Sequence, residues 1–506
     1  MDEPLLLGVD LGTTTCRAVV FDLSGREVAG AAVETPVCYP QPLWAEVDPE
    51  LWWRNVVRVL RSVLGGGAVA PQRIAGVGLS GLMHAPVLVD RAGAPVAPAM
   101  LWMDQRCAPQ VAALRREAGA GDDADGERDG ERDGERDGEG EGNVLASTVS
   151  GPKLRWLAEE RPEVLARAER LLLPKDFIRL RLGGAAGSDP NDASGTGLYD
   201  RDAGAWRWDL VERCRVPRRL LPRLRPPGAP AGVVSPEAAR QTGLLAGTPL
   251  ATGSGDTACT RLGAGRQRPG EACLYLGTAA WIAGPPETPA GGGAPRPRTF
   301  GATSTTGAAL RWLRDVLDPP DGATSEAAAY AALTRRAAGA PPGAEGLFFL
   351  PHLMGERGPV SDPLARGALA GLTLRHGQGH IARAVLEGTA FHLRRLIEGC
   401  FGDRPPSGAI ACGGAARSAL WMQILADVTR LPLRVPAVVE AAALGAAILG
   451  GVAAGTLDED GAGRTMVRPG PGYAPDAAGV AGYGALYERY RSLDDLLAPW
   501  FRAGAA

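Results

Sequence analysis

The sequence predicts an α/β protein built from two related halves. Short apolar runs typical of buried strands alternate with segments of helical period. A strand–turn–strand pattern at residues 5–22 returns at residues 272–284, with Leu-Gly-Thr at both turns. The chain of 506 residues also exceeds one typical domain of about 150 residues. These observations indicate a duplicated domain that holds a nucleotide between its two copies.

The first hairpin carries residues suited to a phosphate. Gly12 has no Cβ, so its backbone can come close to a ligand. Backbone amides and hydroxyls at Thr13 and Thr14 can form an anion cradle. Asp10 cannot bind phosphate itself, but its carboxylate can hold a hydrated Mg²⁺. An ordinary threonine-rich hairpin is the alternative, because short glycine motifs recur by chance.

Charge and cysteine content exclude several functional classes. The 54 basic and 57 acidic residues give a net charge of −3, which offers no electrostatic case for nucleic acid or an anionic membrane. The eight cysteines form no C-x-x-C motif, so we expect free thiols and a cytoplasmic protein. The acidic N-terminus is unlike a signal peptide, and no apolar stretch is long enough to span a bilayer. The sequence leaves oligomeric state open, with a homodimer as one option.

Residues 119–142 differ from the rest of the chain in composition. Gly-Glu-Arg-Asp occurs three times in this segment. Residues 122–141 contain eleven acidic residues and three arginines, a net charge of −8. A segment of this kind cannot bury apolar surface, so we expect a mobile acidic loop without a catalytic role.

Two segments of the first half end in groups suited to a polyol. The buried strand expected at residues 74–80 leads directly to Met83 and His84, and ligands bind at strand ends in α/β sheets. Farther along, Asp104 can accept hydrogen bonds from hydroxyl groups, and Arg106 can orient it. The alternatives are a structural histidine at position 84 and a surface salt bridge between Asp104 and Arg106.

The candidate catalytic base is Asp256. It follows the turn Gly253-Ser254-Gly255 and opens a helix expected at residues 257–262. Phosphoryl transfer to an alcohol needs a proton acceptor at the attacking oxygen, and a carboxylate here can supply it. The alternative is a helix N-cap, which is common for aspartate.

A strand, a glycine pair and a helix follow one another in the second half. Gly413 and Gly414 come directly after the strand expected at residues 409–412. Two residues without side chains allow backbone to approach a flat adenine or ribose, although a glycine pair alone is a weak signal.

Six segments in this order make the chain similar to the FGGY sugar kinases, and most similar to the xylulokinases. The resemblance covers residues 5–455 apart from the acidic loop. The segments are Trp44 to Trp53, Met83-His84, Trp102 to Arg106, Leu173 to Arg179 with Gly187 to Thr196, Gly253 to Asp256, and Pro351 to Arg357.

The resemblance implies a fold and an activity. It implies two ribonuclease-H-like domains of the actin, Hsp70 and sugar-kinase superfamily around a deep interdomain cleft. Residues 1–251 would form the sugar side, and residues 252–506 the nucleotide side with a helical tail. The implied reaction is ATP-dependent phosphorylation of a ketose at its primary hydroxyl, above all D-xylulose to D-xylulose 5-phosphate.

The resemblance also implies the site residues. The general base is Asp256, and Asp10 positions Mg²⁺. Sugar contacts are assigned to Met83, His84, Asp104 and Asp256. Nucleotide contacts are assigned to Thr13, Thr14, Arg17, Gly277, Thr278, Gly413 and Gly414.

Two other functions stay open. Leu82 and Ala85 depart from the common xylulokinase pattern, which leaves a gluconokinase or another sugar or polyol kinase as an alternative. A non-catalytic sugar- or nucleotide-binding regulator is more remote. The presence of Asp10, Thr13 and Asp256 together argues against it, because a regulator needs neither a metal carboxylate nor a base.

Overall fold

The structure is a computed structural model. It describes residues 3–118, 145–201, 203–287, 296–297, 299–317, 326–358, 362, 364–458, 461 and 465–503. The acidic loop expected at residues 119–142 lies outside the described residues. The described chain forms two compact units. The first contains the described residues up to 266 and those of 440–468, and the second contains those of 267–439 and from 469 onward.

This division differs from a single boundary after residue 251. Helix α9 (Asp256–Ala264) and helix α14 (Ala441–Ala453) both belong to the first unit. They pack so closely that a Cβ on Gly445 would lie 1.9 Å from the carbonyl oxygen of Cys259. The chain therefore leaves the first unit and returns to it with α14, because this helix covers the first sheet.

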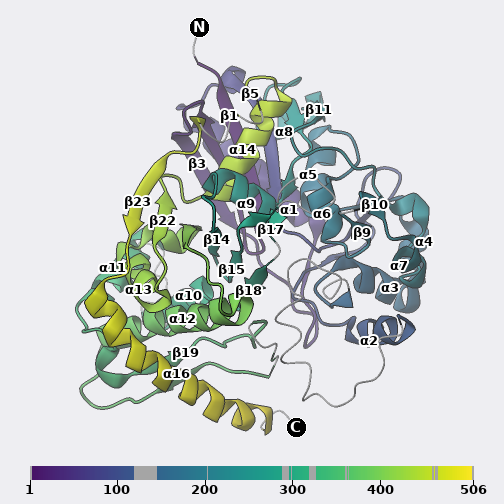
Figure 1. Ribbon diagram of the computed structural model, residues 1–506. Coiled ribbons are helices and arrows are strands. Elements are labelled where there is room, and N and C mark those ends of the chain that lie inside the picture. Colours follow the sequence, from purple (N-terminus) through teal and green to yellow (C-terminus); the bar gives the residue numbers. More distant parts are fainter. Residues whose placement is uncertain are drawn as a thin grey trace. The chain divides into compact units, whose positions relative to one another are not determined.

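The first unit is organised around a seven-stranded sheet (Figure 1). Its spatial order is β11 (Pro230–Val233), β12 (Pro249–Ala251), β5 (Ile74–Gly81), β1 (Leu5–Leu11), β2 (Thr15–Asp22) and β3 (Glu27–Glu34), with β13 (Ser254–Gly255) also paired to β5. Strands β1, β5, β12 and β13 are parallel, whereas β2 runs antiparallel to β1 and β3.

The second unit repeats this topology in a six-stranded sheet. Its order is β18 (Phe300–Ala302), β15 (Ala280–Ala283), β14 (Glu271–Leu276), β21 (Gly408–Cys412), β22 (Leu433–Pro436) and β23 (Pro469–Tyr473). A meander of three antiparallel strands, two parallel strands and an antiparallel edge strand occur in the same sequence of pairings as in the first unit. The predicted duplication of a ribonuclease-H-like α/β domain is therefore confirmed.

Helices and short strand pairs complete both units. The first unit contains α1 (Pro49–Gly65), α2 (Ala108–Glu117), α3 (Ser150–Glu160), α4 (Pro162–Arg167), α5 (Pro174–Leu182), α6 (Pro190–Ser194), α7 (Trp208–Arg213) and α8 (Pro236–Thr242) besides α9 and α14. The second contains α10 (Gly307–Leu317), α11 (Glu326–Ala338), α12 (Gln378–Phe401), α13 (Ala419–Thr429) and α16 (Ala477–Ala503). The short strands are β4 (Glu46–Val47), β6 (Val87–Val89), β7 (Ala99–Met100), β8 (Arg170–Leu172), β9 (Tyr199–Asp200), β10 (Ala205–Trp206), β16 (Pro286–Glu287), β17 (Arg296–Pro297), β19 (Phe348–Leu350) and β20 (Ala368–Ala370). Single 3₁₀ turns lie at Pro71–Arg73, Arg218–Leu220, Ala344–Gly346 and Gly414–Arg417.

Local sequence explains why α1 begins where it does. Asp48 is its N-cap, and its carboxylate accepts a hydrogen bond from the backbone N–H of Glu50 at 3.0 Å. Pro49 suits the first turn because its missing N–H would have no partner there. The apolar face of the helix is buried in the same core as Leu7 and Val9 of β1.

The opposite face of the sheet is covered by α14, and glycine makes that contact possible. Successive strand residues point to opposite faces, so Gly8 and Gly78 face α14 while their neighbours fill the core on the other side. A Cβ on Gly8 would lie 1.9 Å from the carbonyl oxygen of Ala443. A Cβ on Gly78 would lie 1.7 Å from that of Ala446. Helix and strand backbones therefore touch directly.

The core of the second unit centres on α12. Its buried side chains pack with α13 and with three tyrosines of the C-terminal helix α16, namely Tyr483, Tyr487 and Tyr490. Trp421 of α13 donates its indole N–H to the carbonyl of Leu386 at 3.2 Å. Among the described residues, no helix combines the length and the apolar character needed to cross a bilayer.

We expect Gly78→Ala to destabilise the first unit. The added methyl group would overlap the α14 backbone, and overpacking of this kind costs about 1–3 kcal/mol. Urea unfolding of the purified protein measures the loss. Gly65→Ala at the end of α1 is the control, because nothing lies within 4 Å of its Cβ and alanine favours helix. Equal stability of the two variants would contradict the proposed contact.

Candidate functional site

The parallel strands β1, β5 and β13 of the first unit end side by side, at residues that pair with one another. Asp10 of β1 and Ser254 of β13 both pair with Ser80 of β5, one on each side. One residue later, Leu11 and Gly255 both pair with Gly81. Ligands of open α/β sheets bind at such carboxyl ends. The two carboxylates predicted to act in chemistry, at positions 10 and 256, are therefore brought to one edge.

Asp10 lies among groups of both charges. Ser80 donates its hydroxyl to Asp10 Oδ1 at 2.7 Å. Arg17, which pairs with Asp10 across the hairpin, forms an ion pair with Glu440 at the start of α14. Burial raises the pKa of Asp10, and the Ser80 hydrogen bond and the Arg17 charge offset this only in part. The negative charge of Glu440 raises this pKa further.

Asp256 is the first residue of α9. The backbone N–H of Thr257 donates to its Oδ1 at 2.8 Å. Burial, and then the neighbouring charge of Asp10, raises the pKa of Asp256 to about 7. A carboxylate that titrates near neutrality suits a general base, because it is both available and basic at working pH.

Met83 and His84 follow β5, and hydrogen bonds fix both the ring and the backbone carbonyl of His84. Its backbone has a φ of +70°, a left-handed conformation that is uncommon outside glycine. Its Nδ1 lies 2.7 Å from the carbonyl oxygen of Gly195, so Nδ1 carries a proton and donates it to this oxygen. Lys153 donates to the carbonyl of His84 at 3.0 Å and to that of Thr148 at 2.7 Å. Burial lowers the pKa of Lys153 to about 7.

The side chain of Met83 packs against two glycine backbones. A Cβ on Gly255 would lie 2.7 Å from Met83 Cγ, and a Cβ on Gly195 would lie 2.9 Å from its Cε. Gly255 directly precedes Asp256. Of the predicted sugar contacts, the structure thus places Met83, His84 and Asp256 together.

Asp104 differs from the other predicted sugar contacts. It is fully buried, and it accepts a hydrogen bond from the backbone N–H of Ala45 at 2.7 Å. Arg106 donates to it from Nε at 2.9 Å and from Nη2 at 2.6 Å. The same guanidinium pairs with Glu46 at 2.6 Å and lies 3.6 Å from the centre of the Trp44 ring. The structure corrects the expected sugar contact to a buried salt bridge, because protein donors already occupy this carboxylate.

The predicted phosphate turn of the first unit is tightly closed. The N–H of Gly12 donates to the carbonyl of Thr15 at 2.9 Å. Trp102 donates its indole N–H to Thr13 Oγ1 at 3.0 Å. Thr13 and Thr14 are both partly exposed, as a ligand contact requires.

The predicted nucleotide residues of the second unit also lie together. The carbonyl of Gly277 accepts from the N–H of Gly307 at 2.9 Å, which joins the turn with Thr278 to the start of α10. Gly413 has a φ of +94°, and a Cβ there would lie 2.6 Å from the carbonyl oxygen of Leu276. A glycine is therefore required where β21 ends beside the Leu276–Thr278 turn.

The Glu356 carboxylate contacts two histidines. Its Oε2 lies 2.8 Å from His392 Nε2 and 3.2 Å from His352 Nδ1. Its other oxygen accepts from the backbone N–H of Ser304 at 2.9 Å. These contacts fix the loop of residues 351–357, and they join two histidines that lie 40 positions apart in the sequence.

Sequence reasoning missed four polar residues that support the first-unit site. They are Ser80, Lys153, Lys175 and Glu440. Two had a signal: Lys175 interrupts the apolar run Leu171 to Phe177, and Glu440 directly precedes a helix of small residues. Ser80 ends a buried strand, which is a weaker signal, and nothing in the sequence marked Lys153 as buried.

Comparison with known proteins shows the same family over both halves. The model of the N-terminal domain of the FGGY family of carbohydrate kinases matches residues 5–263, and that of the C-terminal domain matches residues 288–454. The chain is 31% identical over 513 residues to the xylulose kinase of Escherichia coli strain K12, covering 98% of this chain and 99% of the relative. It is 32% identical over 489 residues to the glycerol kinase of Paracidovorax citrulli strain AAC00-1, covering 89% and 91%.

A solved structure agrees with these similarities. The crystal structure of xylulose kinase from Rhodospirillum rubrum has a TM-score of 0.74 and 32% identity, covering 98% of this chain and 100% of that one. The duplicated sheets, the paired carboxylates and the whole-length similarity therefore agree. The chain belongs to the FGGY family of carbohydrate kinases, enzymes that transfer phosphate from ATP to a sugar.

Proposed function

We propose that this enzyme phosphorylates the primary hydroxyl of a ketose, with D-xylulose as its substrate and D-xylulose 5-phosphate as its product. The observation that carries the proposal is Asp256, a half-buried carboxylate with a pKa of about 7 beside Asp10 and Met83. Similarity to xylulose kinases over nearly the whole chain supports the choice of sugar. A cytoplasmic location and a homodimer stay predictions from the sequence.

In the proposed mechanism the sugar binds at the end of β5. His84 contacts a sugar hydroxyl through Nε2, while its Nδ1 donates to the carbonyl of Gly195. Met83 supplies an apolar contact for the carbon skeleton. Asp256 then takes the proton of the primary hydroxyl as its oxygen attacks the γ-phosphorus of ATP.

The residues around Asp10 fit a magnesium ion. Mg²⁺ prefers carboxylate oxygens and water, and it is bound with few protein ligands. Asp10 is a partly exposed carboxylate with one oxygen oriented by Ser80, and a second carboxylate lies nearby at position 256. When bound, the ion would neutralise charge on the phosphates. We assign Asp10 to hold it through water.

Nucleotide contacts are proposed on the basis of the family and of the turns described above. In the first unit, Arg17 adds positive charge beside the turn of Thr13 and Thr14. In the second unit, helix α10 begins beside the predicted turn, and a helix N-terminus favours anions. The complete assignment is Thr13, Thr14, Arg17, Gly277 and Thr278 for the phosphates, and Gly413 and Gly414 for adenosine.

The first prediction concerns the acceptor. Relatives include both xylulose and glycerol kinases, and gluconate or another polyol is the remaining alternative from the sequence. We expect the highest kcat/KM with D-xylulose in an ADP-release assay that compares D-xylulose, D-ribulose, gluconate and glycerol. A higher value for gluconate or glycerol would reassign the substrate. Nucleotide binding without phosphorylation of any acceptor would favour a regulator.

The second prediction concerns the base. Asp256→Asn preserves size but cannot take the proton, so we expect kcat to fall by roughly 10²-fold or more. Steady-state ADP release at saturating sugar measures kcat. Asp209→Asn, at an exposed aspartate of α7, is the matched control and should retain wild-type activity. Near-normal turnover of Asp256→Asn would remove this residue from the mechanism.

The third prediction is a pH dependence. Because the base must be deprotonated, and because burial and Asp10 raise the pKa of Asp256 to about 7, kcat/KM should fall as pH decreases through about 7. The charge of Asp10 acts on Asp256, and the charges of Arg17 and Glu440 act on Asp10. Residual activity of Asp256→Asn should lack this acidic limb. A wild-type profile that stays flat down to pH 5 would contradict the assignment.

A further inference from the structure

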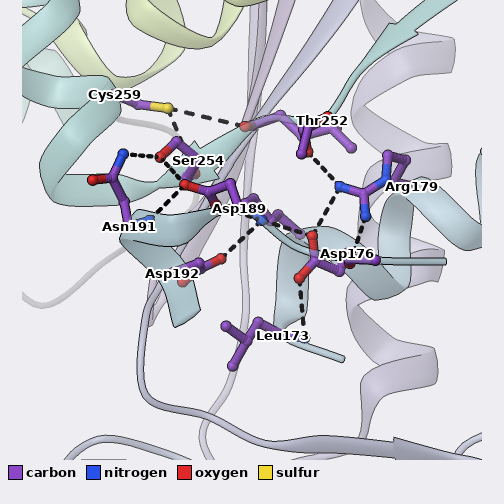
Figure 2. A network of polar contacts seen from close by, with 12 residues as sticks. Leu173, Asp176, Arg179, Asp189, Asn191, Asp192, Thr252, Ser254 and Cys259 are labelled. Carbon is purple, nitrogen blue, oxygen red and sulfur yellow. Dashed lines mark hydrogen bonds and ion pairs between the residues drawn. The ribbon is translucent and has the colours of Figure 1, made fainter. Parts of the chain in front are cut away.

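A buried ammonium group lies near strand β13, which directly precedes the proposed base. Lys175, in the first turn of α5, is fully buried. Its Nζ lies 2.6 Å from Asp176 Oδ1, 3.1 Å from Asp189 Oδ1 and 3.0 Å from Asp192 Oδ2. Figure 2 shows these carboxylates within one network. Burial opposes the charge, yet the three carboxylates raise the pKa of Lys175, so the ammonium stays protonated.

A second buried cation extends the network to the backbone just before the base. Arg179, one turn along α5, contacts Asp176 Oδ1 at 2.8 Å. It also donates to the carbonyl of Thr252 (Figure 2). A further hydrogen bond of 2.7 Å runs to the carbonyl of Gly187. The carbonyl of Thr252 is thereby fixed four residues before Asp256.

The carboxylate of Asp189 holds the next part of the same segment. Ser254 donates its hydroxyl to Asp189 Oδ2 at 2.8 Å and accepts from Asn191 Nδ2 at 3.0 Å. Asp192 lies beside Gly255, where a Cβ would be 3.4 Å from its Oδ1. Figure 2 shows Asp189, Asn191 and Ser254 joined by these contacts. Asp256 follows immediately in the chain.

The sequence around Ser254 explains why polar contacts are needed there. Ser254 stands between Gly253 and Gly255, and neither glycine offers a side chain for packing. Gly253 has a φ of +78°, so an ordinary residue would be strained at its position. The contacts of the Thr252 carbonyl and the Ser254 hydroxyl add to the pairing of β13 with β5 and to the backbone hydrogen bonds of residues 252 and 253.

Stability alone gives no reason for this arrangement. Burying charges is costly, and apolar residues of similar size often stabilise a core equally well. Catalytic groups, by contrast, must be held to within about 0.5 Å of their working geometry. A network that contacts residues 252, 254 and 255 meets that demand for residue 256.

We propose that Lys175, Asp189 and Ser254 form a positioning relay that fixes the carboxylate of Asp256 for proton transfer. Lys175 holds the carboxylate of Asp189, which holds Ser254 and with it strand β13. None of the three touches the reacting atoms, so they are positioning residues. The inference rests on the proposed role of Asp256 as the base.

Helix α6 connects the relay to His84, the residue proposed to bind the sugar. Asp189 is the N-cap of this helix, and Gly195 at its end contacts His84 Nδ1 at 2.7 Å. Asp192, in the same helix, is paired with Lys175. One short helix thus links the segment of the base to the histidine proposed to bind the sugar.

The test uses Ser254→Ala, Asp189→Asn and the double variant in the full-length enzyme. Removing the hydroxyl should lower kcat by about 10-fold, because small misplacements of a catalytic group reduce the rate strongly. The KM for ATP should stay within about twofold, since the relay does not contact the assigned phosphate residues. Because a smaller folded fraction would also lower the apparent kcat at unchanged KM, kcat is expressed per folded enzyme, with the folded fraction of each variant measured by circular dichroism.

The double variant decides whether the two residues act through one contact. If the Ser254–Asp189 hydrogen bond carries the effect, the double variant should lose no more kcat than the worse single variant. Thr242→Val is the matched control, because it removes another fully buried hydroxyl of the same unit. It should leave kcat unchanged. Wild-type kcat in Ser254→Ala, or independent multiplication of the two losses, would overturn the relay.

Lys175 is tested with a variant that also removes one of its acidic partners. Lys175→Met alone leaves three carboxylates facing one arginine, which threatens folding. Combining Lys175→Met with Asp192→Asn removes one of the three acidic partners together with the cation. We expect this double variant to fold and to lose about 10-fold or more in kcat, compared with Asp192→Asn alone. Full kcat would exclude Lys175 from the relay.

These results are distinguishable from a failure of the proposed function. If the wild type phosphorylates no sugar, or Asp256→Asn is fully active, the proposed chemistry fails. If the wild type is active and Asp256→Asn is not, while Ser254→Ala and the Lys175 variant retain full kcat, only the relay is wrong.

Discussion

The structure of the site depends on two carboxylates held side by side at the ends of parallel strands. Asp10 and Asp256 both flank the end of β5, and each is partly removed from water. Burial, and then the charge of Asp10, raises the pKa of Asp256. That is why a carboxyl group can act as a base near neutral pH here, although an exposed aspartate is a weak base at that pH.

Holding these groups requires unusually close backbone packing. Helix α14 packs directly on glycines of β1 and β5. With this helix the chain returns to the first unit after residues 267–439, which belong to the second unit. The same helix begins at Glu440, which pairs with Arg17 beside Asp10. One element thus supports the sheet mechanically and sets part of the charge around the site. Buried Lys153 contacts the carbonyl of His84, and buried Lys175 contacts the carboxylate of Asp189.

Features of the whole chain identify the family, whereas a few side chains determine the substrate. The family is evident from the match of two domain models, the shared topology of the two units and similarity over nearly the whole length. The acceptor, in contrast, depends on the few side chains that follow β5, and the relatives themselves act on different acceptors by name. Met83 and His84 therefore matter more for the proposed choice of sugar than overall similarity does.

The sequence by itself determined the two-domain α/β class, the duplicated hairpins, the family, and the strand ends where Asp10, Met83, His84 and Asp256 stand. These features follow from local patterns and short motifs, which act over a few residues. Only the tertiary structure decided which polar groups are buried together, because burial depends on contacts between distant segments. It enclosed Asp104 in a salt bridge, joined Arg17 to a glutamate 423 residues away, and placed α14 in the first unit.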